Sequence, residues 1–180
     1  LLFVLLAMAD PLVSNFSTLP LSAGNTHHIF LLDASYSMAY RDESETDFER
    51  AKRQIIERIK AGQGGDAYSL ILMGPQAEVV VGQPSYDAQQ LIADLDTLPN
   101  GQAGADLDAA LTAAEQLIQS TADQGTFGQH AITIFSDLGR TTWDDEEQDT
   151  VSGDRRDAQL ARLATGGSIE VVAIQSKGGI

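Results

Sequence analysis

The chain has 180 residues and a mass of 19.2 kDa, which fits one domain with its own hydrophobic core. Its 26 acidic side chains outnumber its 11 basic ones, and the net charge of -15 opposes binding to nucleic acid or to an anionic lipid surface. The absence of cysteine excludes disulfides, thiolate metal sites and cysteine nucleophiles, while 43% hydrophobic residues favour a globular protein.

The chain begins with an apolar segment, Leu1–Ala9. As a helix it would reach about 14 Å, whereas the hydrocarbon of a bilayer is roughly 30 Å thick. Three interpretations stay open: the end of a transmembrane helix, which we prefer, the end of a signal peptide, or a buried core segment. The first predicts more apolar residues before Leu1. Since no Lys or Arg precedes Arg41, a membrane-anchored domain is expected on the non-cytoplasmic side, periplasmic or extracellular.

Residues 10–26 contain Pro, Ser and Thr and are predicted to link this segment to a domain over residues 27–180. Apolar runs in that domain predict five strands, at His28–Leu32, Ala67–Met73, Glu78–Val81, Ala131–Phe135 and Ile169–Ile174, and the first is expected to be buried on both faces. Apolar residues at helical spacing predict helices between them: one after a capping box at Thr46 and Glu49, one capped by Ser85, one over Leu107–Ile118, and one through Leu160 and Leu163.

Strands that alternate with helices predict an α/β fold, a doubly wound and mostly parallel sheet with helices on both faces. The short Gly74-Pro75 turn indicates that the third strand runs antiparallel to the second. Numbered along the chain, the expected strand order is 3-2-1-4-5, which makes the first and fourth strands neighbours. No helix follows the last strand, so we expect the domain to continue beyond the C-terminus.

Oxygen-bearing side chains follow these two neighbouring strands. Asp33 ends the first strand and Asp137 follows the fourth, and ligands of such sheets bind at the carboxyl ends of the strands. Ser35 and Ser37 alternate with other residues after Asp33, so all three side chains can point to one place. Hard oxygen ligands suit Mg2+, Mn2+ or Ca2+ and do not suit zinc.

The run Ile29–Met38 resembles the metal-ion-dependent adhesion site of von Willebrand factor A (vWA) domains, whose motif is Asp-x-Ser-x-Ser. Gly65–Ile71 is similar to the second strand of that family and Thr133–Asp137 to its fourth, so the resemblance extends over residues 26–174. The apolar start, Leu1–Pro11, resembles the membrane-anchored vWA proteins of the bacterial aerotolerance (Bat) type.

The resemblance implies that Asp33, Ser35, Ser37 and Asp137 hold a divalent cation. Two segments depart from the family pattern. Gly104-Ala105-Asp106-Leu107 replaces Gly-Thr-polar-Leu, so a threonine hydroxyl is missing. Asp106 could bind the ion instead, but a carboxylate at the start of a helix also stabilises that helix. Asp137-Leu138 replaces Asp-Gly, and the family's sixth strand is expected beyond this sequence.

The preferred hypothesis is a membrane-tethered, non-enzymatic interaction domain of the bacterial envelope. Its ion, Mg2+ or alternatively Mn2+ or Ca2+, would bind an Asp or Glu of a protein partner. A second hypothesis is a scaffold of the same fold with a degenerate metal site, and a third is a hydrolase or phosphotransferase. Against the third, Ser35 stands where a haloacid-dehalogenase-like enzyme needs its second Asp, and no Gly-x-Ser-x-Gly motif occurs.

Other polar residues have structural interpretations. His27, His28 and His130 begin strands and are expected to be structural. They lie at the edge of the sheet away from the crevice that is expected where the first and fourth strands end. The acidic run from Asp144 to Asp149 is expected to be a solvated loop near the crevice, where it could concentrate cations.

Overall fold

The computed structural model describes residues 25–42, 45–99, 101, 103–122, 125–139 and 150–174. The predicted apolar segment 1–9, the linker up to residue 24 and the acidic run 144–149 lie outside the described residues. The assignment of residues 1–9 to a membrane or signal segment, and of 10–26 to a linker, therefore stays a prediction.

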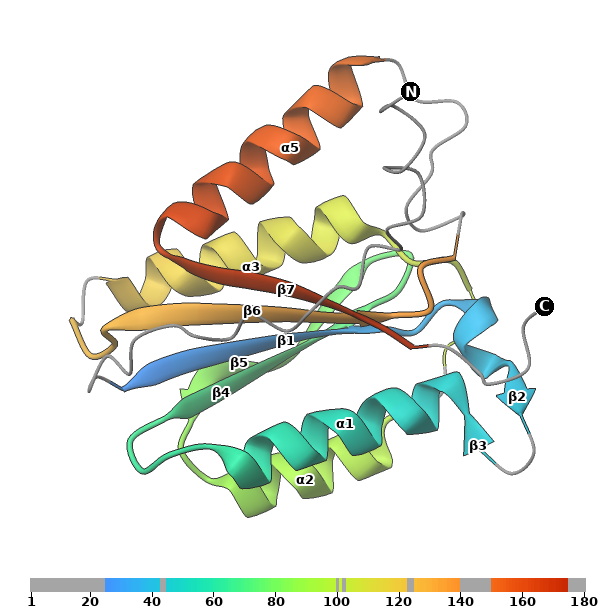
Figure 1. Cartoon of the computed structure of the whole chain (residues 1–180), viewed down its shortest axis with the longest axis horizontal. Helices are drawn as coiled ribbons and strands as arrows, with labels where there is room; N and C mark the ends of the chain where they lie inside the picture. Colours follow the sequence, from blue (N-terminus) through green and yellow to red (C-terminus); the bar gives the residue numbers. More distant parts are fainter. Residues whose placement is uncertain are drawn as a thin grey trace, which may run out of the picture.

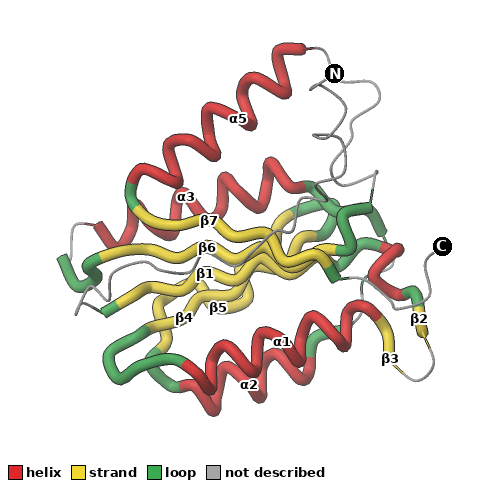
Figure 2. The backbone as a smooth tube through the Cα atoms, viewed as in Figure 1, coloured by secondary structure: helices red, strands yellow, loops and turns green. Residues whose placement is uncertain are grey.

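A five-stranded sheet forms the centre of the domain (Figures 1 and 2). Its strands are β1 (Thr26–Asp33), β4 (Ala67–Met73), β5 (Ala77–Ser85), β6 (Gln129–Ser136) and β7 (Gly167–Ala173). Their order in space is β5-β4-β1-β6-β7, and all neighbours are parallel except β4 and β5. The predicted α/β class, the order 3-2-1-4-5 and the antiparallel third strand are confirmed.

Helices cover both faces of the sheet, as Figure 1 shows. One face carries α1 (Asp47–Ala61) and α2 (Ala88–Thr97), and the other carries α3 (Leu107–Ala122) and α5 (Thr150–Thr165). In β1, Phe30 and Leu32 pack towards α1 and α2, whereas Ile29 and Leu31 pack towards α3 and α5. Because both faces of β1 are buried, its sequence is a continuous apolar run instead of an alternating one.

The helices begin where side-chain oxygens accept hydrogen bonds from the free backbone N–H groups of the first turn. At α1 the predicted capping box is confirmed: Glu49 N donates to Thr46 Oγ1 at 3.1 Å, and Thr46 N donates to Glu49 Oε2 at 2.7 Å. The prediction that Ser85 caps α2 is wrong. Ser85 is the last residue of β5, and Asp87 is the cap, accepting from the N–H groups of Gln89 and Gln90 at 3.0 Å each.

Three short elements separate β1 from α1. They are the 3-10 helix η1 (Tyr36–Ala39) and the strands β2 (Arg41–Asp42) and β3 (Glu45–Thr46), which pair as an antiparallel hairpin apart from the main sheet. The sequence pattern did not predict the hairpin, because two-residue strands are too short to show an alternation of apolar and polar residues.

The histidines lie at the amino end of the strands and contribute to packing there, as expected. His27 is fully buried, its Nε2 lies 2.9 Å from Ser69 Oγ, and its ring stacks on Phe127 with 5.0 Å between centroids. The ring of His130 meets that of His27 edge-on, with 5.5 Å between centroids. Burial, followed by repulsion from His130 and His28, lowers the pKa of His27 to about 4.

We therefore predict a loss of stability in mild acid that depends on His27. The unfolded chain binds a proton at His27 below pH of about 6.5, but the folded chain does so only near pH 4. The free energy of unfolding should fall across this window, by at most about 3 kcal/mol. Chemical denaturation of wild type and His27→Gln between pH 7 and pH 4 measures the effect. The variant should show a shallower pH dependence, and parallel profiles would contradict a buried neutral His27.

Candidate functional site

The candidate site lies at the carboxyl edge of the sheet, where β1 and β6 end side by side. Leu32 pairs with Phe135 in the parallel register, so Asp33 and Asp137 leave the sheet at the same edge. Gly139 shows how closely the two loops approach. A Cβ added there would lie 3.1 Å from Asp137 Oδ1 and 3.2 Å from Ser37 Oγ. The structure thus brings Ser37 and Asp137 together across two loops.

Asp33 is fully buried and both of its carboxylate oxygens accept hydrogen bonds. Ser35 N donates to Oδ1 at 2.8 Å, and Ser136 Oγ donates to Oδ2 at 2.6 Å. Burial raises the pKa of the Asp33 carboxyl and the Asp137 carboxylate adds to this, whereas the hydrogen bonds from Ser136 and Ser35 oppose the rise. Two carboxylates so placed repel each other unless a proton or a cation lies between them.

The two serine hydroxyls lie together beside Asp33. Ser35 Oγ and Ser37 Oγ are 3.0 Å apart, with Ser35 buried and Ser37 half-buried. The turns of η1 fix this arrangement, since Met38 N donates to Ser35 O at 3.1 Å and Tyr40 N donates to Ser37 O at 2.9 Å. The alternating spacing therefore places both hydroxyls on one side of the loop, as the sequence predicts.

A third segment, around residues 101–106, packs against the first loop. Tyr36 N donates to Ala103 O at 2.8 Å, and Ser35 forms a parallel bridge with Ala103. Gly101 approaches the backbone so closely that a Cβ there would lie 1.6 Å from Ala34 O. Only a residue without a side chain fits this position without a shift of the backbone.

Asp106 has a capping role in this segment. Its Oδ1 accepts from Ala109 N at 2.8 Å, at the start of α3, and its own N–H donates to Gly74 O at 2.9 Å. The side chain is exposed, and the neighbouring Ala105 packs against the apolar layer beneath α3. The helix-start role considered for Asp106 is therefore present, and its role as a metal ligand stays a prediction.

Ser136 connects the two loops, and sequence reasoning missed it. It is fully buried, donates to Asp33 Oδ2 and accepts from Leu138 N at 3.0 Å. Its only signal in the sequence is a hydroxyl directly before Asp137, at a position where a buried strand has no apolar residue. Ser136 thus fixes the orientation of Asp33 and the start of the loop that carries Asp137.

The donor set fits a hard divalent cation. Asp33, Ser35, Ser37 and Asp137 offer carboxylate and hydroxyl oxygens at one edge, which is the ligand chemistry of Mg2+, Mn2+ and Ca2+. Among the described residues, no group of three or more His, Asp or Glu side chains is arranged to hold a metal. A cation here would therefore depend on the serine hydroxyls and on water as well as on the two carboxylates.

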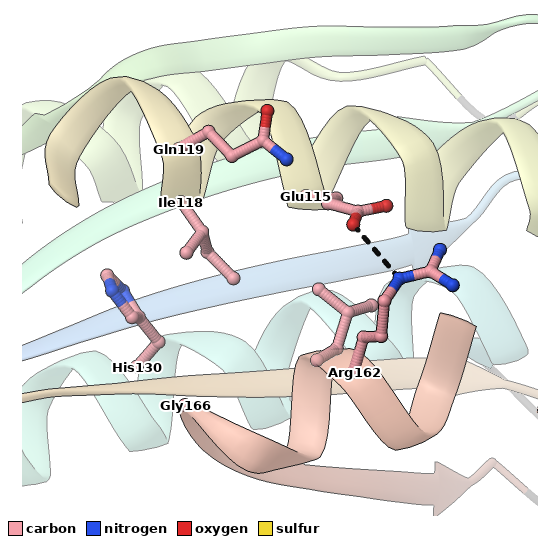
Figure 3. A pocket seen from close by; sticks show the side chains of 7 residues that line it. Glu115, Ile118, Gln119, His130, Arg162 and Gly166 are labelled. Atoms are coloured by element: carbon pink, nitrogen blue, oxygen red, sulfur yellow. Dashed lines mark hydrogen bonds and ion pairs between the residues drawn. The ribbon is translucent and has the colours of Figure 1, made fainter. Parts of the chain in front are cut away.

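Two of the cavities in the described part of the chain lie away from this edge. Figure 3 shows one of about 150 Å³ between α3 and α5, lined by Ile118 and His130 and bordered by Glu115 and Arg162. The two charged side chains pair with each other, with 3.4 Å between Arg162 Nε and Glu115 Oε1. This favours a packing role for the residues around the cavity over a ligand-binding role. The second, of about 370 Å³, lies beside Phe127, near the end of α3.

Fold and site together define an α/β domain with carboxylate and hydroxyl groups gathered at the carboxyl edge of a mixed sheet. A model of the von Willebrand factor type A domain matches residues 28–140, and the chain belongs to this family. All five predicted site residues lie within the matched range. The class is thus that of a protein-interaction domain, and domains of this family are generally non-enzymatic.

Solved structures support the fold. The conserved hypothetical protein BatB from Bacteroides thetaiotaomicron is similar with a TM-score of 0.62 and 21% identity, over 87% of this chain and 73% of that chain. An aerotolerance-related membrane protein from Bacteroides fragilis NCTC 9343 has a TM-score of 0.59 and 21% identity, over 87% and 74%. The SpRpn10 VWA domain has a TM-score of 0.58 and 14% identity, over 82% and 74%. No curated protein matches the chain significantly.

We predict that the close approach of Gly101 to Ala34 is required for a stable site. Gly101→Ala should lower the free energy of unfolding by about 1–3 kcal/mol, because the new methyl group overlaps a backbone carbonyl. Gly104→Ala is the matched control: a Cβ there meets nothing within 4 Å, so its effect should stay within about 0.5 kcal/mol. Urea denaturation of both variants compares them, and equal losses of stability would contradict the packing described for Gly101.

Proposed function

We propose that this domain binds a protein partner through a divalent cation, Mg2+ or alternatively Mn2+ or Ca2+, held at the carboxyl edge of the sheet. The observation that carries the proposal is the convergence of Asp33, Ser35 and Ser37 on one loop with Asp137 on the next. Such a cation would offset the repulsion between the two carboxylates and would be bound by oxygen atoms alone.

The number of ligands explains how a partner is held. Asp33, Ser35, Ser37 and Asp137 supply at most four ligands, whereas Mg2+ takes six in near-octahedral geometry. At least two positions are then filled by water, and a carboxylate from a partner can replace one of them. Because the two serine hydroxyls are neutral, the ion keeps positive charge that attracts an Asp or Glu of the partner.

Membrane attachment is part of the proposal. Its support is the apolar segment Leu1–Ala9 and the likeness to an aerotolerance-related membrane protein. No helix within the described ranges combines the length and the hydropathy of a membrane span, and residues 1–9 are outside those ranges. We propose a domain tethered through this segment, with the site on the periplasmic or extracellular side.

A second candidate function is a scaffold that binds partners without a metal ion. It is favoured by Ala105, which offers no hydroxyl and packs against the apolar layer, and by Asp106, whose carboxylate caps α3. In this case the loops at the edge of the sheet would still form the binding surface, but the cation would have no part in it.

Thermal unfolding in Mg2+ separates the two functions. An ion that binds only the folded domain stabilises it by mass action, by about 3 kcal/mol when its concentration is 100 times Kd. The melting temperature should rise by several °C in wild type and stay constant in Asp33→Ala. Glu57→Ala removes an exposed carboxylate of α1 and should keep the wild-type response. Equal responses of wild type and Asp33→Ala would exclude the cation site.

Substitutions in the 104–107 segment test how a cation is held. If the segment approaches the ion as in the family, Ala105→Thr should add a hydroxyl ligand and strengthen Mg2+ binding several-fold. Asp106→Ala should weaken binding only if Asp106 is a ligand, and otherwise it should only cost the cap, about 1 kcal/mol of stability. Mg2+ titration calorimetry on both variants, with urea denaturation, distinguishes these outcomes. A loss of cap stability with unchanged Mg2+ affinity would remove Asp106 from the ligand set.

A further inference from the structure

Large apolar side chains are exposed on the loops that carry the candidate ligands. Tyr36 is 74% exposed, Tyr40 58% and Leu138 42%. Tyr36 and Tyr40 lie on and just after η1, at the carboxyl end of the sheet (Figure 1). Leu138 lies between Asp137 and Gly139, and Gly139 is the residue beside Ser37. We call Tyr36, Tyr40 and Leu138 the apolar rim, because they lie on or next to the two loops that carry the carboxylates and hydroxyls of the site.

Backbone hydrogen bonds fix the main chain at both tyrosines. Tyr36 N donates to Ala103 O at 2.8 Å and Tyr40 N donates to Ser37 O at 2.9 Å. Ser35, directly before Tyr36, is buried towards Asp33. The backbone at Tyr36 is therefore already ordered before a partner binds, so binding would cost only the rotamer freedom of the exposed ring.

Leu138 is presented at a cost to the fold. Its φ of 59° lies in the left-handed region, where a branched side chain is strained and glycine is not. The conformation is held because Leu138 N donates to Ser136 Oγ at 3.0 Å and Gly139 N donates to Asp137 Oδ1 at 2.9 Å. Since the side chain is 42% exposed, burial within the domain only partly offsets the strain. Strain of this kind gathers at functional sites.

We propose that the apolar rim binds an aromatic or aliphatic side chain of the partner, next in its sequence to the carboxylate that reaches the cation. This inference rests on the proposed cation function and defines the partner more narrowly. The partner segment is not a run of acidic residues, because the domain would repel it. The chain carries a net charge of -15, and one divalent ion compensates for little of that charge. The segment that fits has one Asp or Glu flanked by apolar residues and is otherwise neutral or basic.

Displayed heptapeptides test the inference. One library has a fixed central Asp and the other a fixed central Asn, and both are random at the other positions. The full 180-residue chain selects from each in millimolar Mg2+. We expect the Asp library to be preferred, with aromatic and aliphatic residues enriched several-fold within two positions of the Asp and with acidic residues depleted.

Variants show whether the rim produces this preference. Leu138→Gly should reduce the apolar enrichment while the melting temperature rises, because glycine relieves the strain. Tyr36→Ser should reduce the enrichment as well, and both variants should keep the preference for Asp over Asn. Tyr86→Ser is the matched control, since Tyr86 is 57% exposed but stacks near Phe127, away from the site. It should leave the selection unchanged.

Each result has a defined meaning. Selection for Asp without apolar neighbours, or apolar enrichment that Leu138→Gly and Tyr36→Ser leave intact, overturns the role of the rim while the cation function stands. Apolar enrichment that is equal in the Asp and Asn libraries overturns both the cation function and the pairing of the two groups in one segment. If selection enriches no particular residue at any position of either library, the rim is not a peptide-binding surface and the inference is wrong.

Discussion

The buried carboxylate of Asp33 is the constraint on which the edge of the sheet depends. A charge without contact to water is costly unless donors surround it. Here one donor, the Ser35 N–H, lies in the loop after β1, and the other, the Ser136 hydroxyl, lies at the end of β6. The same carboxylate therefore fixes the first loop, the last residue of β6 and the distance between them. Any account of function at this edge has to explain why the charge is kept.

Parallel pairing of β1 and β6 makes this arrangement possible. Two parallel neighbours end at the same edge, and their helices return on opposite faces, so the loops after β1 and β6 emerge side by side. Gly101 brings a third loop to this edge by lying against the carbonyl of Ala34. The site is thus built from three loops that the sheet brings to one edge and that backbone contacts and the Ser136 hydroxyl hold together.

The fold could be predicted almost entirely from the sequence, because it is encoded in long apolar runs and in the helical spacing between them. Even so, the sequence pattern does not distinguish Ser85 from Asp87 as the cap of α2, because both residue types are good caps and β5 continues as an edge strand through Pro84. For the site, the alternating Asp33, Ser35 and Ser37 were recognisable. Ser136 was not, because its role depends on a partner 103 residues away in the chain. The exposure of Leu138 likewise depends on its positive φ, and no pattern in the sequence indicates that a leucine adopts this backbone angle.

The two ends of the sheet respond to protons in opposite ways. At the amino end, His27 must stay neutral to remain buried, so protonation in mild acid costs stability. At the carboxyl end, the raised pKa of Asp33 means that its charge costs stability above that pKa, and the cost disappears as the pH falls through it. Burial is the main cause of this cost and repulsion from Asp137 adds to it. A proton removes the cost, and a divalent cation bound by both carboxylates would offset it. Only the cation leaves the carboxylates charged and adds a positive centre that a partner's Asp or Glu can reach. Under the proposed function, a cation bound here would add stability and a binding surface in the same event, and this would give the domain a reason to keep a costly carboxylate at this edge.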